Sequence, residues 1–155
     1  MKTIRSIFFI AAFSCFFSAL PALAGIKMAS VSKEGINVRT GPGKEYGIKW
    51  DYGKGFPFII IGNNGNWYKI KDFENDVGWI YKPLTNKTPH MIVKANRGTG
   101  KQINIRSGPG TNYKTVARAY YGVVFKTIDK KNGWVKVEHD SGTTGWIKRT
   151  LLWGF

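Results

Sequence analysis

The sequence has little cysteine and little negative charge. Cys15 is the only cysteine among 155 residues, and it lies in an apolar N-terminal stretch. Once that stretch is removed, the chain has no disulfide, no thiolate metal ligand and no thiol nucleophile. Only 9 acidic residues accompany 24 basic ones, which gives a formal net charge of +15. Such a basic protein is drawn to anionic polymers, although charge alone identifies no ligand.

The first 24 residues have the pattern of a secretory signal peptide. Lys2 and Arg5 form a positive start, residues 7–20 are nearly all apolar, and small residues precede a cleavage point after Ala24. We therefore predict export to the periplasm or cell envelope, with no transmembrane segment in the mature chain. Two alternatives stay open. One is an uncleaved anchor, although the apolar run is shorter than the ~20 residues of a span, and the other is lipidation at Cys15.

The charge of the mature chain is uneven. Residues 25–84 hold 9 basic and 6 acidic residues, a net charge of +3, whereas residues 85–155 hold 13 and 3, a net charge of +10. Export makes nucleic acid a poor partner. We expect envelope polymers, such as cell-wall glycan strands, or an acidic exported protein instead.

An internal duplication organises the mature chain. "INVRTGPGKEY" begins at Ile36 and "INIRSGPGTNY" begins at Ile103, an offset of 67 residues. Without any gap, 16 of the 49 positions from 36 to 84 are identical to their counterparts. We divide the chain into a signal peptide (1–24), a first domain (25–84), a linker (85–90) and a second domain (91–155).

Each copy is predicted to be all-β. "INVR" and "INIR" alternate apolar and polar residues, and "WYKIK" and "WVKVE" follow turn-forming clusters. "GPG" is typical of a type II turn, with proline second and glycine third. No segment after residue 25 has a helical period. About five short strands in ~60 residues favour a small, partly open barrel.

Three motifs occur in the same order in both copies: "INVRTGPG" or "INIRSGPG", a tryptophan after a turn, and "GWI" followed by a leucine. They resemble the bacterial Src-homology-3-type (SH3b) domain over roughly residues 28–84 and 91–155. The tandem layout and the closing "LLWGF" resemble a group of exported proteobacterial SH3 proteins with no assigned enzymatic activity. The predicted fold is thus two SH3-like, partly open β-barrels in tandem.

The resemblance implies a binding module, most often one that recognises peptidoglycan peptides. The "GW" dipeptides at Trp79 and Trp146 are similar to those of modules that bind teichoic acids, although they also suit the last strand of this fold. One departure concerns ligand type. The proline that helps eukaryotic SH3 domains bind Pro-rich peptides is replaced by Tyr81 and Lys148.

Aromatic residues after the turns are the main ligand-binding candidates, because a small barrel recognises partners through its loops. Tyr46, Trp50 and Tyr52 are expected in one such loop, and Tyr113, Tyr120 and Tyr121 in the other. Trp67 and Trp134 lie opposite the aliphatic face of their strands, and they either bind a flat ligand or close the barrel. Arg39 and Arg106 are candidate anion contacts, although we favour a turn-anchoring role.

No residue pattern supports catalysis, and we expect no metal and no cofactor. "HDS" from His139 contains the types of a catalytic triad, but neighbours in sequence cannot face one another as a triad requires. "RGTGK" from Arg97 lacks the leading glycine and the Ser or Thr of a phosphate loop. Asp72, Glu74 and Asp76 lack the spacing of a calcium loop and suggest a solvated hairpin tip. The sequence favours peptidoglycan or envelope recognition, with an adaptor for an acidic protein as the alternative.

Overall fold

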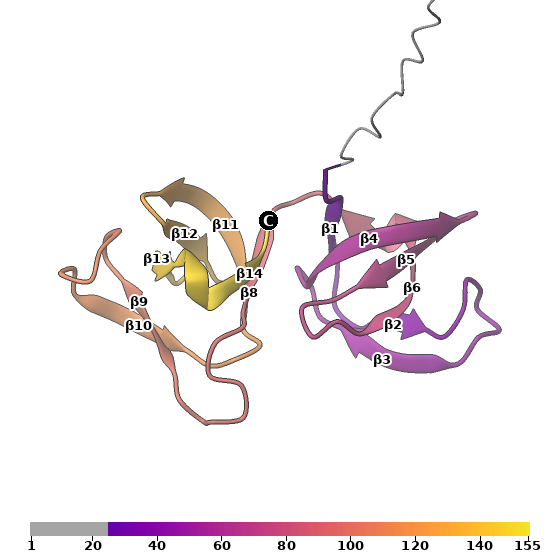
Figure 1. Ribbon diagram of the computed structural model, residues 1–155, viewed down its shortest axis with the longest axis horizontal. Coiled ribbons are helices and arrows are strands. Elements are labelled where there is room, and N and C mark those ends of the chain that lie inside the picture. Colours follow the sequence, from indigo (N-terminus) through magenta and orange to yellow (C-terminus); the bar gives the residue numbers. More distant parts are fainter. Residues whose placement is uncertain (1–24) are drawn as a thin grey trace, which may run out of the picture.

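The computed structural model describes residues 25–155, so the predicted signal peptide and Cys15 lie outside the described residues. Two β-barrels lie side by side (Figure 1), and each consists of one curled seven-stranded antiparallel sheet. The predicted all-β fold with two tandem SH3-like barrels is confirmed. Within residues 25–155, no helix has the length and apolarity needed to cross a membrane.

The two barrels repeat one order of elements. The first contains β1 (Met28–Val31), β2 (Ile36–Arg39), β3 (Ile48–Tyr52), β4 (Pro57–Asn64), β5 (Trp67–Lys71), β6 (Val77–Tyr81), the short 3₁₀ helix η1 (Lys82–Leu84) and β7 (Thr85–Asn86). The second contains β8 (His90–Val93), β9 (Ile103–Arg106), β10 (Thr115–Ala119), β11 (Val124–Lys131), β12 (Trp134–Glu138), β13 (Thr144–Lys148), η2 (Arg149–Leu151) and β14 (Leu152–Gly154). The strand orders are β3-β2-β6-β5-β4-β1-β7 and β10-β9-β13-β12-β11-β8-β14.

Two strands per barrel come from sequence outside the 49-residue repeat. β1 pairs with β4 on one side and with β7 on the other, and β8 likewise lies between β11 and β14. The segment predicted as a linker therefore begins with β7 and ends at the first residue of β8. Ser30 is fully buried, and its hydroxyl donates to the Thr88 carbonyl at 3.1 Å. This bond ties β1 to the chain between the barrels.

Each barrel has its own core, formed by the inward-facing residues of the alternating strands. Val38, Phe58, Ile70 and Ile80 have no solvent exposure in the first barrel. Their counterparts Ile105, Phe125, Val137 and Ile147 are 2% exposed or less. Burial of each such side chain contributes about 1.5–3 kcal/mol. The alternation in "INVR" and "INIR" therefore places the apolar residues of these strands in the core, as predicted from the sequence.

The Gly-Pro-Gly segments adopt a tighter turn than expected. The Gly43 N–H donates to the Gly41 carbonyl at 3.0 Å, and Gly110 does the same to Gly108. A type II turn needs a positive φ at its third residue, and neither Gly43 nor Gly110 has one. The type II prediction is therefore wrong. The bond from residue i+2 to residue i is that of a γ-turn, which suits the fixed φ of the central proline.

The tyrosine after each turn explains the first glycine. A Cβ on Gly41 would run into the ring of Tyr46, and a Cβ on Gly108 would run into the ring of Tyr113. Each ring thus lies directly on its glycine. The repeated phrase "GPG" plus tyrosine is a packing unit of the scaffold.

The barrels differ most in the loop that follows their first strand. Residues 32–35 connect β1 to β2, whereas residues 94–102 connect β8 to β9. The longer loop carries "RGTGK" and is held by the Thr99 hydroxyl, which donates to the Asn96 carbonyl at 2.9 Å. It brings Arg97 to the first barrel. The longer loop therefore gives the second barrel a contact with the first barrel that the shorter loop of the first barrel cannot make.

Candidate ligand-binding grooves

The structure separates the aromatic candidates into three places. Tyr46 and Tyr113 cover the Gly-Pro-Gly turns and are 42% and 43% exposed. Trp67 lies with its ring centroid 5.4 Å from that of Tyr81, beside a small hollow that Arg39 also lines. Trp134 is half-buried at the same place in the second barrel. The remaining candidates lie in or beside two larger grooves.

Trp50 and Tyr52 do not lie in a loop as the sequence suggested. Both are on β3, where Val38 pairs with Trp50 and Ile36 pairs with Tyr52. Tyr52 is 5% exposed and stacks on Phe56 at a centroid distance of 3.8 Å and an interplanar angle of 10°. Tyr52 is therefore a wall of the barrel core rather than an exposed contact. The alternation of β3 places it inward, a signal visible in "IKWDY".

A groove of about 400 Å³ opens above this stacked pair. We call it the first groove. Aromatic residues and four acidic residues line it. Its residues are Trp50, Asp51, Tyr52, Phe56, Asp72, Phe73, Glu74, Asp76 and Tyr121.

Asp72 organises the floor of the first groove. It was expected at a solvated hairpin tip, but it is only 6% exposed. One carboxylate oxygen accepts from the backbone N–H groups of Glu74 and Asp76, both at 2.9 Å. The other accepts from the Tyr52 hydroxyl at 2.8 Å. The expectation failed because three donors hold the carboxylate inside the turn.

The polar groups beside Asp72 differ in how completely their hydrogen-bonding capacity is used. Burial, and then the hydrogen bond to Asp72, raises the pKa of the Tyr52 hydroxyl well above its usual range. The Trp50 indole N–H lies near enough to this hydroxyl to lower that pKa slightly. Nevertheless the indole N–H is buried and makes no well-formed hydrogen bond to any described residue. The Tyr52 hydroxyl oxygen is thus the acceptor that lies beside this buried donor.

The second barrel completes the first groove. Phe73 lies 5.4 Å from Tyr121 and 6.4 Å from Trp153 between ring centroids. The Tyr121 hydroxyl donates to Glu74 Oε1, and Arg97 Nη2 lies 3.1 Å from the same oxygen. Burial, and then the bond to Glu74, raises the pKa of Tyr121 to about 12. Glu74 is thus engaged by the second barrel, whereas Asp51 and Asp76 are exposed.

A second groove of about 320 Å³ occupies the equivalent place in the second barrel. At the offset of 67 residues, Ala117, Arg118 and Ala119 replace Trp50, Asp51 and Tyr52. Val123, His139 and Ser141 replace Phe56, Asp72 and Glu74. The candidate Tyr120 lies at its rim and is 54% exposed. The second groove therefore has alanines where the first has Trp50 and Tyr52, and no carboxylate lies in its lining. Its residues are Gln102, Ile105, Ala117, Arg118, Ala119, Tyr120, Val123, Phe125, His139, Ser141 and Thr143.

The two arginines anchor turns. Arg39 Nη1 donates to the carbonyls of Lys44 and Tyr46 at 3.0 and 2.7 Å. Arg106 Nη1 donates to the Tyr113 carbonyl at 2.8 Å. These bonds are the turn-anchoring role favoured from the sequence. The anion-contact role stays a prediction.

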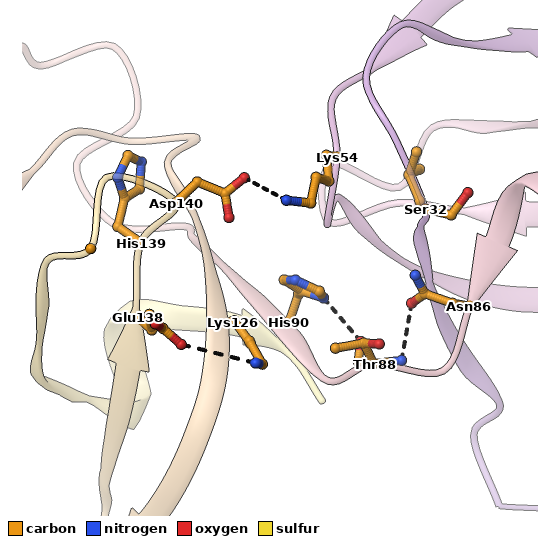
Figure 2. Close-up of a pocket in the computed structure, with 11 residues that line it drawn as sticks. Ser32, Lys54, Asn86, Thr88, His90, Lys126, Glu138, His139 and Asp140 are labelled. Carbon is orange, nitrogen blue, oxygen red and sulfur yellow. Dashed lines mark hydrogen bonds and ion pairs between the residues drawn. The ribbon is translucent and has the colours of Figure 1, made fainter.

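A third hollow, of about 350 Å³, lies between the barrels (Figure 2). Lys54 and Asp140 reach across it and form an ion pair at 3.0 Å. His90 Nδ1 lies 3.0 Å from the Thr88 carbonyl, and burial lowers the pKa of this imidazole. Lys126 and Glu138, at 3.9 Å, form the wall on the side of the second barrel. Its charges are mixed, so it has no clear preference for a ligand of one sign.

The described residues contain no set of three or more side chains placed to bind a metal ion. His139 Nδ1 lies 2.8 Å from the Ser141 hydroxyl, but the Asp140 carboxylate is directed to Lys54. The "HDS" segment therefore does not have the geometry of a triad.

Sequence reasoning missed six members of the first groove as site residues: Asp51, Phe56, Asp72, Phe73, Glu74 and Asp76. The missed signal was the chain's few acidic residues, because four of the six carboxylates in residues 25–84 line this one groove. Arg97 was also missed, since nothing in the second copy indicates that its loop reaches the first.

Two curated proteins are similar in sequence. YrvJ of Bacillus subtilis, whose name assigns it provisionally to the N-acetylmuramoyl-L-alanine amidases, is 31% identical over 137 residues. That match covers 84% of this chain and 26% of YrvJ. Serine/threonine-protein kinase D of Synechocystis is 42% identical over 55 residues, which cover 32% of this chain and 11% of the kinase. This chain thus spans about a quarter or less of the length of either relative.

Among solved structures, an NlpC/P60 family protein from Bacillus cereus has a TM-score of 0.38 at 10% identity, with 83% of this chain and 56% of that chain covered. NlpC1 from Trichomonas vaginalis has a TM-score of 0.35 at 15% identity, with 91% and 50% covered. The model of the family described as "Bacterial SH3 domain" matches residues 32–87 and again 99–154. Two matches that together span most of the chain, each on one barrel of the duplicated fold, show that this protein belongs to the bacterial SH3 domain family.

Proposed function

We propose that the mature protein is an exported, non-catalytic module that binds the peptidoglycan of the cell envelope. The observation that carries this proposal is the pair of grooves at equivalent positions in two bacterial SH3 barrels, one of them walled by aromatic rings. The similarity to a protein named for an amidase that acts on N-acetylmuramoyl-L-alanine supports the same class of ligand.

The geometry of the grooves fits peptide better than glycan. The aromatic walls of the first groove are close together, and Tyr52 and Phe56 are stacked on one another rather than spread as a flat platform for a sugar ring. Two grooves on one chain raise the avidity for a polymer that repeats its peptide.

Retention on purified, protein-free sacculi tests the proposal. The mature chain, residues 25–155, is expected to sediment with sacculi in 150 mM salt and to remain bound when the salt is raised several-fold. Binding that disappears as salt increases would indicate general attraction of a basic protein to an anionic polymer, because ionic screening weakens such contacts. A protein that stays in the supernatant at 150 mM salt would contradict the proposal.

A second candidate function is an adaptor for an acidic exported protein. The observation that favours it is the basic surface of the second barrel, where Arg118, Lys126, Lys130 and Lys131 are all exposed. Lys130 and Lys131 lie at the end of β11 next to the hairpin turn. A variant that reverses these four charges should lose partners recovered from envelope extract. If it captures the same partners equally well, charge is not the basis of binding.

A further inference from the structure

We propose that the second groove is a binding site for one aromatic side chain, of about the size of tyrosine, presented by a partner protein. The first barrel carries the evidence, because it fills the equivalent place with aromatic side chains of its own. This inference goes beyond the proposed wall-binding function, since aromatic side chains belong to proteins and not to glycan strands. It also supplies the second candidate function with a site that does not depend on surface charge.

The second barrel has small residues at the positions where the first barrel has rings. Tyr52 pairs with Ile36 on β2. Ala119 pairs on β9 with Ile103, the residue equivalent to Ile36, so the strand register is the same in both barrels. Only the side chains differ. The three replacements are Ala117 for Trp50, Ala119 for Tyr52 and Val123 for Phe56.

In the first barrel, the ring at this place is part of the core. Tyr52 is 5% exposed, stacks on Phe56 and donates its hydroxyl hydrogen to Asp72 at 2.8 Å. The residue equivalent to Asp72 is His139, which lines the second groove. Its ring lies edge-on to that of Phe125, with the centroids 5.6 Å apart. The second barrel therefore keeps the surroundings of such a ring but has no ring at the position of Tyr52.

The second groove reaches residues of the barrel core. Ile105 and Phe125, each 2% exposed, are among its lining residues. Their equivalents Val38 and Phe58 do not line the first groove. The volume of about 320 Å³ lies within the range of about 300–1,000 Å³ for ligand pockets, and an apolar cavity of about 150 Å³ is enough for benzene. The second groove thus has room for one aromatic ring against an apolar floor.

The rim of the second groove suits the polar end of a tyrosine. The Ser141 hydroxyl lies 2.8 Å from His139 Nδ1 and 3.2 Å from the Thr143 hydroxyl, and all three residues line the groove. Hydroxyl and imidazole groups are hydrogen-bond partners for a phenol. They give a bound ring the kind of polar contact that Asp72 gives to Tyr52. A flat ring with one polar end therefore matches this groove.

Permanent charge has no part in this selection. Arg118 is exposed, and it alternates along β10 with the inward-facing Ala117 and Ala119. Its Nε donates to Asn104 Oδ1 on the neighbouring strand at 3.3 Å. The groove therefore selects its ligand by shape and apolar surface.

The test is an NMR titration of residues 25–155 with N-acetyl-L-tyrosinamide, and separately with N-acetyl-L-alaninamide. The tyrosine probe is expected to shift the methyl resonances of Ala117, Ala119 and Val123, because a bound ring lies beside these groups. The alanine probe should leave them unchanged, since a single methyl group buries too little apolar area. Equal responses to the two probes would overturn the inference.

The variant Ala119→Tyr gives the second groove the residue that the first barrel has at this position. The new ring is expected to occupy the groove as Tyr52 occupies the first barrel, so the response to the tyrosine probe should be lost. Thr115→Tyr is the matched control, because Thr115 is exposed on the same strand and lies outside the groove lining. It should bind the probe as the parent does.

Val123→Phe is a second and smaller filling of the groove, and it keeps the test open if Ala119→Tyr does not fold. It should weaken binding of the tyrosine probe about tenfold, because a ring added to a filled site overpacks it. An affinity equal to that of the parent in either folded variant would contradict the assignment.

Retention on sacculi separates this inference from the wall-binding function. Ala119→Tyr leaves the first groove intact, so it should still be retained. If the parent is retained but the tyrosine probe causes no shift, the wall-binding function stands and the aromatic site is wrong. If the probe binds as expected but the parent is not retained, the aromatic site stands and the wall-binding function fails.

Discussion

The two grooves lie at the same place in two barrels of the same strand order. Even so, no position that lines both grooves has the same residue in the two copies. The 16 identities between the copies include buried strand residues, the Gly-Pro-Gly turns with their tyrosines, and the "GWI" strand. None falls on residues 50–52, 56, 72–74 or 76, which line the first groove. The duplication therefore retained a scaffold and allowed its two recognition surfaces to differ.

The comparison extends to a turn whose sequence is unrelated in the two copies. Asp72 Oδ1 accepts from the N–H two residues on, and His139 Nδ1 accepts from the Ser141 N–H at 3.2 Å in the same way. The third residue after Asp72 and after His139 also has a positive φ, 70° at Asn75 and 84° at Gly142. "DFEND" and "HDSGT" thus build one turn with different side chains. Only the first version places its acceptor in the barrel core.

The largest effect is expected for Asp72→Ala. This change leaves the Tyr52 hydroxyl and two backbone N–H groups without their acceptor, which costs about 3 kcal/mol of the free energy of unfolding. His139→Ala, at the equivalent position, should cost less than about 1 kcal/mol because His139 is only half-buried. Native-state amide exchange measures the two barrels separately. Similar losses in both variants would mean that the turns are energetically equivalent after all.

The next effect concerns the contact through which the second barrel completes the first groove. Glu74→Gln removes the ion pair with Arg97 and should lower the free energy of unfolding by about 1 kcal/mol, since Arg97 is largely exposed. The pKa of Tyr121 should fall from about 12 but stay above 10.0, because burial, the larger cause, remains while the Glu74 carboxylate is gone. A spectrophotometric tyrosine titration measures this shift. Ser141→Ala is the control in the second barrel, and a Tyr121 pKa unchanged by Glu74→Gln would exclude the contact.

A smaller, pH-dependent effect is expected at His90, between the barrels. Burial lowers the pKa of His90 below 6.5, while Lys54, Lys126 and Asp140 act on it from the surrounding walls. An unfolded chain binds a proton there at a higher pH than the folded one does. Stability from this residue is therefore full above pH 6.5 and is lost as the pH falls below it. Urea unfolding from pH 8 to 5 should show this decline, and His90→Gln should flatten it. A slope of opposite sign would contradict the assignment.

The sequence predicted the scaffold well because the scaffold depends on local patterns. Alternation in "INVR" and the glycines before Tyr46 and Trp79 are visible as letters, and each has a direct structural cause. A Cβ on Gly78, for instance, would run into Val38 and lie 3.2 Å from the Arg39 carbonyl. The grooves were harder to predict, because Tyr52, Asp72 and Tyr121 meet only through the curvature of the sheet and the packing of one barrel on the other. Composition showed that acidic residues are few but not that four of them lie together.

The smallest expected effect on the free energy of unfolding concerns an ion pair between the barrels, which is compared with one inside a single barrel. Within residues 25–155, two ion pairs join the barrels: Arg97–Glu74 and Lys54–Asp140. The side chains of Lys54 and Asp140 are 50% and 69% exposed. Lys54→Gln should therefore cost less than about 1 kcal/mol, and high salt should abolish the difference. The hydrogen bond from Lys54 holds the pKa of Asp140 below 3.8, so the pair contributes above that pH and is lost as the pH falls through the folded value.

Lys126→Gln is the matched control, because Lys126 lies 3.9 Å from Glu138 within the second barrel. Both variants should have nearly the same free energy of unfolding at 150 mM salt, but only Lys54→Gln removes a contact between the barrels. Rotational correlation times from NMR relaxation should then decrease for Lys54→Gln and stay constant for Lys126→Gln. If neither variant tumbles differently, the barrels are held in place by Phe73, Tyr121 and Trp153. The apolar side of the first groove, rather than its surface charges, would then fix how the two grooves face a common polymer.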